Sequence, residues 1–182
     1  NVFSGSRRIH RRYDLKGSTV GRKASIKELK KAAPVLKDLD WVRDEASLAL
    51  DDNSRTRILT ALRDDVSFLK EWGLMDYSLL VGVHDRDEED SRKREAMNVV
   101  YVQDRKRLGY LGIVDILTTY GWRKWTETLF LGHLSCGSDI SCQHPRVYGD
   151  RFLRFAQDYV FQIQTSELEN ATDNTERRLE RL

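Results

Sequence analysis

The chain has 182 residues, of which 40% are hydrophobic and 33% charged, so it fits one globular domain, and its 2 Pro and 11 Gly exclude collagen-like and low-complexity classes. The net charge of +2 is unevenly distributed, because residues 1–31 contain ten Lys/Arg and two acidic residues, a balance of +8 that leaves −6 for the remainder. This basic block is suited to the phosphates of a nucleotide, a nucleic acid or an anionic membrane, or it is a solvated face without a partner.

The first fifty residues predict short elements. Alternating polar and apolar residues predict a strand over 12–16 that ends at the turn Gly17-Ser18. Ser25 is suited to capping a short helix that runs through Ala33 and stops at Pro34. The pattern between 35 and 50 is ambiguous and is interpreted as one or two short strands.

The remainder predicts two longer helices and three strands. Apolar residues at helical spacing predict an amphipathic helix over roughly 55–72, followed by Gly73. Strands are predicted over 77–83, 99–102 and 108–116, with a charged spacer over 85–95. Pro145 begins a last helix, whose expected apolar side consists of Val147, Tyr148, Phe152, Phe155, Tyr159 and Val160. Beyond 164 the polar chain is a solvated helix or a disordered tail.

Two aspartates, Asp76 and Asp115, each stand alone among apolar residues, in what should be buried or half-buried strands. A buried carboxylate is costly unless it is paired or coordinated. Either acid alone is explained by a turn cap at the end of a strand. Both together with the basic strand around Lys16 fit phosphoryl transfer, which needs one acid to orient the attacking hydroxyl, one to hold Mg²⁺, and cations for the phosphates.

Several strings in the sequence closely resemble the phosphatidylinositol phosphate kinase family, in the same order and at the same spacing. These are Tyr13-Asp14-Leu15-Lys16-Gly17-Ser18-Thr19, Arg22 with Ala24-Ser25, Lys37-Asp38-Leu39-Asp40-Trp41, Met75-Asp76-Tyr77-Ser78-Leu79-Leu80-Val81-Gly82-Val83-His84, Gly112-Ile113-Val114-Asp115-Ile116-Leu117, and Tyr148 with Arg151-Phe152. The resemblance runs from about Ile9 to Phe161 and is most like the type I enzymes, which phosphorylate phosphatidylinositol 4-phosphate at the 5-position. It implies an α+β fold, the protein-kinase-like C-terminal lobe of that family, in which antiparallel strands pack with helices.

The resemblance also implies roles for single residues. Asp76 resembles the catalytic-loop acid that contacts the substrate hydroxyl, and Asp115 resembles the metal-binding acid of the family. Lys16 and Arg22 resemble its phosphate-facing cations. ATP and Mg²⁺ are the implied cofactors, and phosphatidylinositol 4-phosphate in an anionic membrane is the implied partner, with the protein cytoplasmic and peripheral on the inner face of the plasma membrane. A homodimer is compatible with the resemblance.

Residues of about 120–143 resemble the family's specificity loop. Glu127 falls where the type I enzymes carry glutamate and the type II enzymes alanine, which favours a 5-kinase. The alignment also tolerates a slip of one residue, which would make Glu127 an ordinary surface glutamate. Where the family has paired lysines, this sequence has Arg123-Lys124 before Trp125, so one of the two cations is displaced by one position relative to the family. Lys124 is the cation that we expect to contact the headgroup.

The same loop has an amphipathic pattern, with Trp122, Trp125, Leu129 and Phe130 at helical spacing. Such a helix can lie in a membrane interface with its aromatic side chains at the headgroup level. The alternative is a helix packed in the core. We expect membrane contact here, beside the basic block of residues 1–31.

The glycine-rich phosphate loop and strand lysine of the family's N-terminal lobe do not occur in this sequence. We therefore expect residues 1–163 to be the C-terminal part of a catalytic domain, with 164–182 as a polar tail. The chain alone should bind ATP poorly and needs the N-terminal lobe of the parent protein. The competing interpretation is a catalytically inactive, phosphoinositide-binding module. Nucleic-acid binding is disfavoured because the basic residues lack interleaved aromatic residues other than Tyr13.

Overall fold

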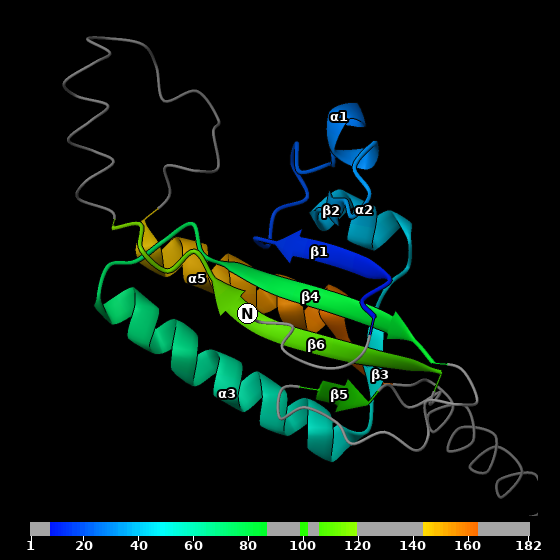
Figure 1. The fold of residues 1–182 in the computed structure, drawn as a ribbon. Coiled ribbons are helices and arrows are strands. Elements are labelled where there is room, and N and C mark those ends of the chain that lie inside the picture. The colour runs from blue at the N-terminus through cyan, green and yellow to red at the C-terminus, as the bar shows by residue number, and fades with distance from the viewer. Residues whose placement is uncertain (1–7, 87–98, 102–105, 120–143, 164–182) are drawn as a thin grey trace, which may run out of the picture.

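The computed structural model describes residues 8–86, 99–101, 106–119 and 144–163, and it confirms an α+β architecture (Figure 1). The elements in chain order are β1 (Arg11–Leu15), α1 (Ile26–Leu29), β2 (Val35–Leu36), α2 (Asp38–Arg43), β3 (Leu48–Leu50), α3 (Asp52–Glu71), β4 (Ser78–Asp85), β5 (Val99–Tyr101), β6 (Arg107–Val114), α5 (Pro145–Phe155), the π-helical turn η3 (Ala156–Val160) and β7 (Phe161–Ile163). Within these ranges, none of the helices is both long enough and apolar enough to cross a bilayer.

A five-stranded sheet with the order β2-β1-β4-β6-β5 forms the centre of the fold, and β3 pairs with β7 in a second, two-stranded sheet. The central strand β4 is antiparallel to both of its neighbours, β1 and β6. The N-terminal end of β4 therefore lies beside the C-terminal ends of β1 and β6. This end of the sheet is where the chemistry predicted from the sequence is expected.

Helices α3 and α5 cover one face of the sheet (Figure 1). Helix α3 is capped by Asp51, whose side chain accepts the Ser54 N–H, and it ends before Gly73 at a φ of +63°. Its apolar stripe is buried in the same core cluster as the inward residues of β1 and β4 and the aromatic residues of α5; this stripe consists of Leu59, Leu62, Val66 and Leu69. The stripe is therefore core, as the helical spacing predicted.

Most predicted elements are confirmed, with corrections where tertiary contacts intervene. Helix α1 ends at Leu29 rather than at Ala33, because the Glu28 carboxylate accepts the Val35 N–H at 3.0 Å and turns the chain back into β2. Between 35 and 50 the structure contains α2 as well as the strands β2 and β3. Val147 and Tyr159 are exposed, so the expected apolar side of α5 is narrower than predicted.

Candidate active site

Three residues singled out from the sequence, Lys16, Asp76 and Asp115, lie at one end of the central sheet. Lys16 follows the last paired residue of β1, which is opposite Leu79 of β4. Asp76 precedes the first paired residue of β4, and Asp115 follows the last paired residue of β6, where Ser78 is opposite Val114. Strand register therefore places the lysine and the two acids at adjacent strand ends, although 99 positions separate the first from the last in the sequence.

Asp115 is not in a buried strand, as the sequence had suggested. Strand β6 ends at Val114, and Asp115 is exposed. Asp76 also lies outside its strand and is half-buried. The apolar residues that follow Asp115 are exposed as well, Ile116 at 45% and Leu117 at 91%. Both acids thus occupy turns, and neither of these two carboxylates is fully buried.

Both acids adopt a left-handed backbone conformation, with φ of +64° at Asp76 and +62° at Asp115. Residues with a Cβ atom rarely adopt positive φ because of steric clashes with the backbone, and aspartate is among those that tolerate it. The two turns are tied together, because the Met75 N–H donates to the Thr118 carbonyl at 2.9 Å and Leu74 is bridged to Thr119. Backbone strain of this kind concentrates at functional sites.

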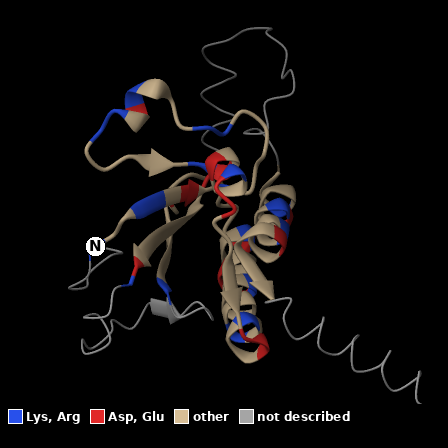
Figure 2. Cartoon of the chain, turned by 90° about the vertical axis from the view of Figure 1, so that its right-hand side faces the viewer, with Lys and Arg blue, Asp and Glu red and all other residues tan. Residues whose placement is uncertain are grey.

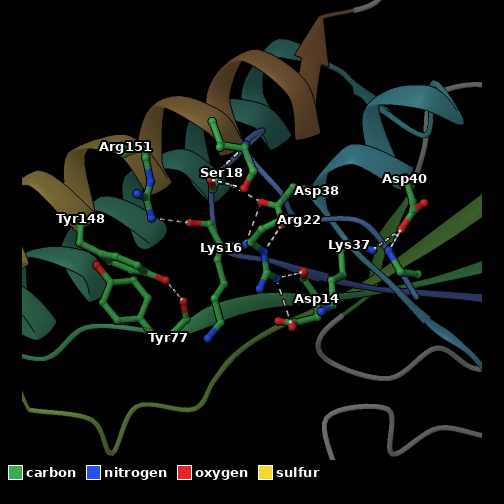
Figure 3. A network of polar contacts seen from close by, with 12 residues as sticks. Asp14, Lys16, Ser18, Arg22, Lys37, Asp38, Asp40, Tyr77, Tyr148 and Arg151 are labelled. Carbon is green, nitrogen blue, oxygen red and sulfur yellow. Dashed lines mark hydrogen bonds and ion pairs between the residues drawn. The ribbon is translucent and has the colours of Figure 1, made fainter. Parts of the chain in front are cut away.

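The Lys16 ammonium has no ion-pair or hydrogen-bond partner within the described part of the chain, and its side chain extends away from the neighbouring polar network (Figure 3). The next residue, Gly17, has a φ of +74°, and an added Cβ would lie 2.7 Å from the Phe152 Cα. The backbone of this loop therefore packs closely against α5, and the Lys16 ammonium is available to bind an anion.

Asp38 holds this loop, a role that the sequence analysis missed. Its fully buried carboxylate accepts the Lys16 and Ser18 N–H groups, both at 3.0 Å, and the Arg22 Nε–H at 2.6 Å (Figure 3). The neighbouring acid Asp40 is also buried and accepts the Ala24 N–H at 2.8 Å. Asp38 and Asp40 lie in the first turn of α2, a few residues after Pro34. This sequence pattern could have predicted their capping role.

Arg22 was predicted to face a phosphate, and the structure places it between two acids. Besides Asp38, its Nη2 donates to the Asp14 carbonyl at 2.6 Å and lies 3.2 Å from the Asp14 carboxylate. Burial opposes the charge of Arg22, but these acids outweigh it and raise its pKa above the ordinary arginine value. Arg22 fastens the loop that carries Lys16, and its phosphate contact stays a prediction.

Helix α5 brings two more residues to the site. The Arg151 Nη2 donates to the Lys16 carbonyl at 3.4 Å, and its guanidinium lies 5.0 Å from the centre of the Tyr148 ring. Burial lowers the pKa of Arg151, against the opposing charges of Tyr148, Asp38 and Asp76. Both residues belong to the strings that carry the family resemblance, but their roles could not be predicted from the sequence.

The donors at this end of the sheet suit Mg²⁺. Magnesium is usually held by one or two carboxylates together with substrate phosphates and water. Asp115 is exposed and follows its strand directly, so it meets this requirement. In the described ranges there is no group of three or more His, Cys, Asp or Glu side chains that could form a metal site from protein alone. Asp115, at the strand end next to the one that carries Asp76, is therefore the fitting ligand for a metal shared with phosphate.

The predicted specificity and membrane residues fall in 120–143, outside the described residues. They are Trp122, Lys124, Trp125, Glu127, Leu129 and Phe130. The tail 164–182 is likewise outside them.

Comparison with known proteins bears on the family. A family model described as Phosphatidylinositol-4-phosphate 5-Kinase matches residues 1–103 and 92–159. The chain is 33% identical to phosphatidylinositol 5-phosphate 4-kinase type-2 alpha of Gallus gallus, over 85% of this chain and 50% of that protein. It is 34% identical to the type-2 gamma enzyme of Xenopus tropicalis, over 85% of this chain and 49% of that protein.

A third relative, phosphatidylinositol 4-phosphate 5-kinase type-1 beta of Homo sapiens, is 30% identical over 88% of this chain and 38% of that protein. The chain thus spans about half the length, or less, of these relatives. The strings that carry the resemblance lie inside the matched ranges, and several of them build the end of the sheet described above. The chain belongs to the phosphatidylinositol phosphate kinase family.

Proposed function

We propose that the protein transfers the γ-phosphoryl group of ATP to the 5-hydroxyl of phosphatidylinositol 4-phosphate, which gives phosphatidylinositol 4,5-bisphosphate. The observation that carries the proposal is the convergence of Lys16, Asp76 and Asp115 at one end of the sheet. Phosphoryl transfer depends mainly on positioning and charge stabilisation, and these are the groups it requires.

Each residue has a distinct task in this proposal. Asp76 accepts a hydrogen bond from the attacking hydroxyl, orients it and takes its proton. The hydroxyl oxygen bonds to the γ-phosphorus while the bond to the β–γ bridging oxygen breaks, and ADP leaves. Lys16 stabilises the negative charge on the phosphate oxygens. Asp115 would hold Mg²⁺, which would supply positive charge to offset the negative charge of the phosphates.

The choice of the 5-hydroxyl is supported by Glu127, through the resemblance of its loop to type I enzymes. The matched family model and the type-1 beta relative bear 5-kinase names. The second candidate acceptor is the 4-hydroxyl of phosphatidylinositol 5-phosphate, because the type-2 relatives of Gallus gallus and Xenopus tropicalis reach 33% and 34% identity. Both belong to the same chemistry and differ only in which hydroxyl is presented to Asp76.

The test is a vesicle assay of the protein produced from its complete coding sequence, with phosphatidylinositol 4-phosphate or phosphatidylinositol 5-phosphate offered separately and the product headgroup identified. We expect turnover of the 4-phosphate, and a loss of about 10²–10⁴-fold in kcat for Asp76→Asn. Asp64→Asn, on the exposed side of α3, is the matched control and should retain full activity.

Each result of this assay has one meaning. Equal activity of wild type and Asp76→Asn contradicts the mechanism. Phosphorylation of the 5-phosphate alone overturns the choice of hydroxyl. Vesicle binding without any turnover supports the inactive lipid-binding module instead.

We also propose that the protein docks on an anionic membrane, as a cytoplasmic protein on the inner face of the plasma membrane. Figure 2 shows the Lys and Arg residues of β1 and α1 on the side of the molecule away from α3. Among these cations, Ile26 is 75% and Leu29 46% exposed. Exposed apolar residues set among lysines are typical of a surface that binds anionic lipid.

Vesicle sedimentation tests this surface. Ile26→Ser with Leu29→Ser should weaken binding to vesicles that contain anionic lipid, since two apolar contacts with the bilayer are lost. Phe68→Ser on α3, where the side chain is 58% exposed and its ring centroid lies 6.0 Å from that of Trp72, is the control and should bind normally. Unchanged binding of the double variant would contradict this docking surface.

A further inference from the structure

One turn of α5 contacts both loops that carry the proposed catalytic groups. Tyr148 reaches the loop of Asp76, and Arg151 reaches the loop of Lys16 (Figure 3). The two residues are three positions apart, so they lie on the same side of the helix. A rigid helical turn therefore spans the distance between a lysine and an acid that different strands contribute.

The contact with the Asp76 loop is made by the Tyr148 hydroxyl, which donates to the Tyr77 carbonyl. The paired register of β4 with β6 begins at Ser78, so this carbonyl lies one residue outside the ladder. The Tyr148 and Tyr77 rings also meet edge to face, with centroids 4.9 Å apart, and both residues are buried. Tyr77 is held by its ring and by its carbonyl, directly beside the left-handed Asp76.

The contact with the Lys16 loop is equally close. Arg151 donates to the Lys16 carbonyl, and its guanidinium lies on the Tyr148 ring, so the two α5 side chains support each other. An added Cβ at Gly17 would lie 3.2 Å from the Arg151 carbonyl and 2.7 Å from the Phe152 Cα. The backbone of the loop thus rests directly on the same turn of α5.

We propose that Tyr148 is a positioning residue that fixes Asp76 relative to Lys16, acting through the Tyr77 carbonyl and supported by Arg151. The inference rests on the proposed kinase function. Tyr148 takes no part in the chemistry, and its contribution is the placement of the acid that orients the acceptor hydroxyl. Displacement of a reacting group by about 1 Å can lower turnover by about 10²-fold, and a contact that acts only on this placement changes kcat rather than KM.

The test is Tyr148→Phe in the protein produced from its complete coding sequence, since this change removes one hydroxyl and keeps the ring. We expect kcat per folded molecule to fall about tenfold, with KM for ATP and for lipid within about twofold of wild type. Hydrogen exchange at the amides of residues 76–78 should be about tenfold faster, because their local opening becomes easier.

Tyr13→Phe is the matched control. Tyr13 is as buried as Tyr148, its hydroxyl donates one hydrogen bond to Asp44 at 3.3 Å, and it meets Trp41 edge to face. The control should lose stability without losing kcat per folded molecule, measured well below the unfolding midpoint. If Tyr148→Phe does not fold, Arg151→Lys tests the same turn, because it keeps the charge and loses the planar contact with Tyr148; it should also lower kcat.

The outcomes separate the two proposals. Full kcat in Tyr148→Phe, or an equal loss of kcat in Tyr13→Phe, overturns the positioning role while leaving the kinase function intact. If the wild type phosphorylates no phosphoinositide, the proposed function fails. In that case hydrogen exchange at 76–78 still tests the placement of the loop, and exchange unchanged from wild type overturns it.

Discussion

The half-buried Arg22 forms an ion pair with the fully buried Asp38, with the Arg22 Nε 2.6 Å from the Asp38 Oδ2. The second oxygen of the same carboxylate accepts the backbone N–H groups of Lys16 and Ser18. One side chain therefore fixes three groups of the loop that carries the proposed phosphate-binding lysine. The pair stabilises the shape of the loop, and its removal is the most direct way to ask how much the site depends on it.

Asp38→Ala should lower the free energy of unfolding by about 3–5 kcal/mol, because it leaves the Arg22 Nε–H and two backbone donors without their acceptor, while Asp14 still pairs with Arg22. Urea denaturation measures this change. Asp64→Ala on the exposed surface of α3 should stay within about 0.5 kcal/mol of wild type. A loss below about 1 kcal/mol for Asp38→Ala would show that water replaces the carboxylate readily.

Gly17 and Gly21 form a natural matched pair. Both have positive φ, at +74° and +69°, but only Gly17 has neighbours within 4 Å of an added Cβ. Gly21→Ala should cost about 1 kcal/mol, from backbone strain alone. Gly17→Ala should cost about 2–5 kcal/mol, since the helix backbone must also move.

Thermal or urea unfolding of the two glycine variants gives the comparison. Gly17→Ala should also lower kinase turnover, because Lys16 moves with the loop. Equal destabilisation of the two variants would mean that the loop does not rest on α5 in solution.

The left-handed conformation of Asp115 predicts different stabilities for its glycine and alanine variants. Glycine adopts this conformation without a Cβ penalty, whereas alanine retains the penalty and loses the polar side chain. We expect Asp115→Gly to be about 1 kcal/mol more stable than Asp115→Ala by urea denaturation. Both should lose kinase activity, since neither offers a carboxylate to Mg²⁺. An alanine variant as stable as the glycine variant would contradict the positive φ.

Alkaline pH should destabilise the fold through its buried tyrosines. Burial, with a smaller effect of the nearby Asp44, raises the pKa of Tyr13 from 10.0 to about 12. Burial is also the main cause that raises the pKa values of Tyr77 and Tyr148. Because the folded state holds these protons more tightly, their contribution to stability is complete below pH 10 and is lost as pH rises from about 10 towards 12.

Urea midpoints recorded at pH 8, 10 and 11 check the direction. The wild-type midpoint should fall between pH 10 and 11, and Tyr13→Phe should fall less steeply, because one titrating group is absent. Parallel curves for the two proteins would show that Tyr13 titrates normally in the folded state.

Local pattern predicted the longer elements well. The helix over 55–72 is confirmed as α3 and the strand over 12–16 as β1, because apolar periodicity, a capping residue and a terminal glycine act within a few positions of the chain. The short helix after Ser25 was predicted too long, since its end depends on a contact between Glu28 and Val35 across the turn. The segment 35–50 was ambiguous because its buried acids bind backbone groups of another segment.

The candidate site likewise depends partly on local sequence and partly on tertiary contacts. The sequence by itself determined which side chains are present, which family their strings resemble, and that Lys16, Asp76 and Asp115 are the groups to follow, because these properties belong to residue type and spacing. Only the tertiary structure decided that the lysine and the two acids lie at adjacent strand ends. It also decided that the acids occupy left-handed turns and that Asp38, Tyr148 and Arg151 hold the loops. These contacts join residues 20 to 135 positions apart, so they exist only once strand pairing and helix packing have closed the chain on itself.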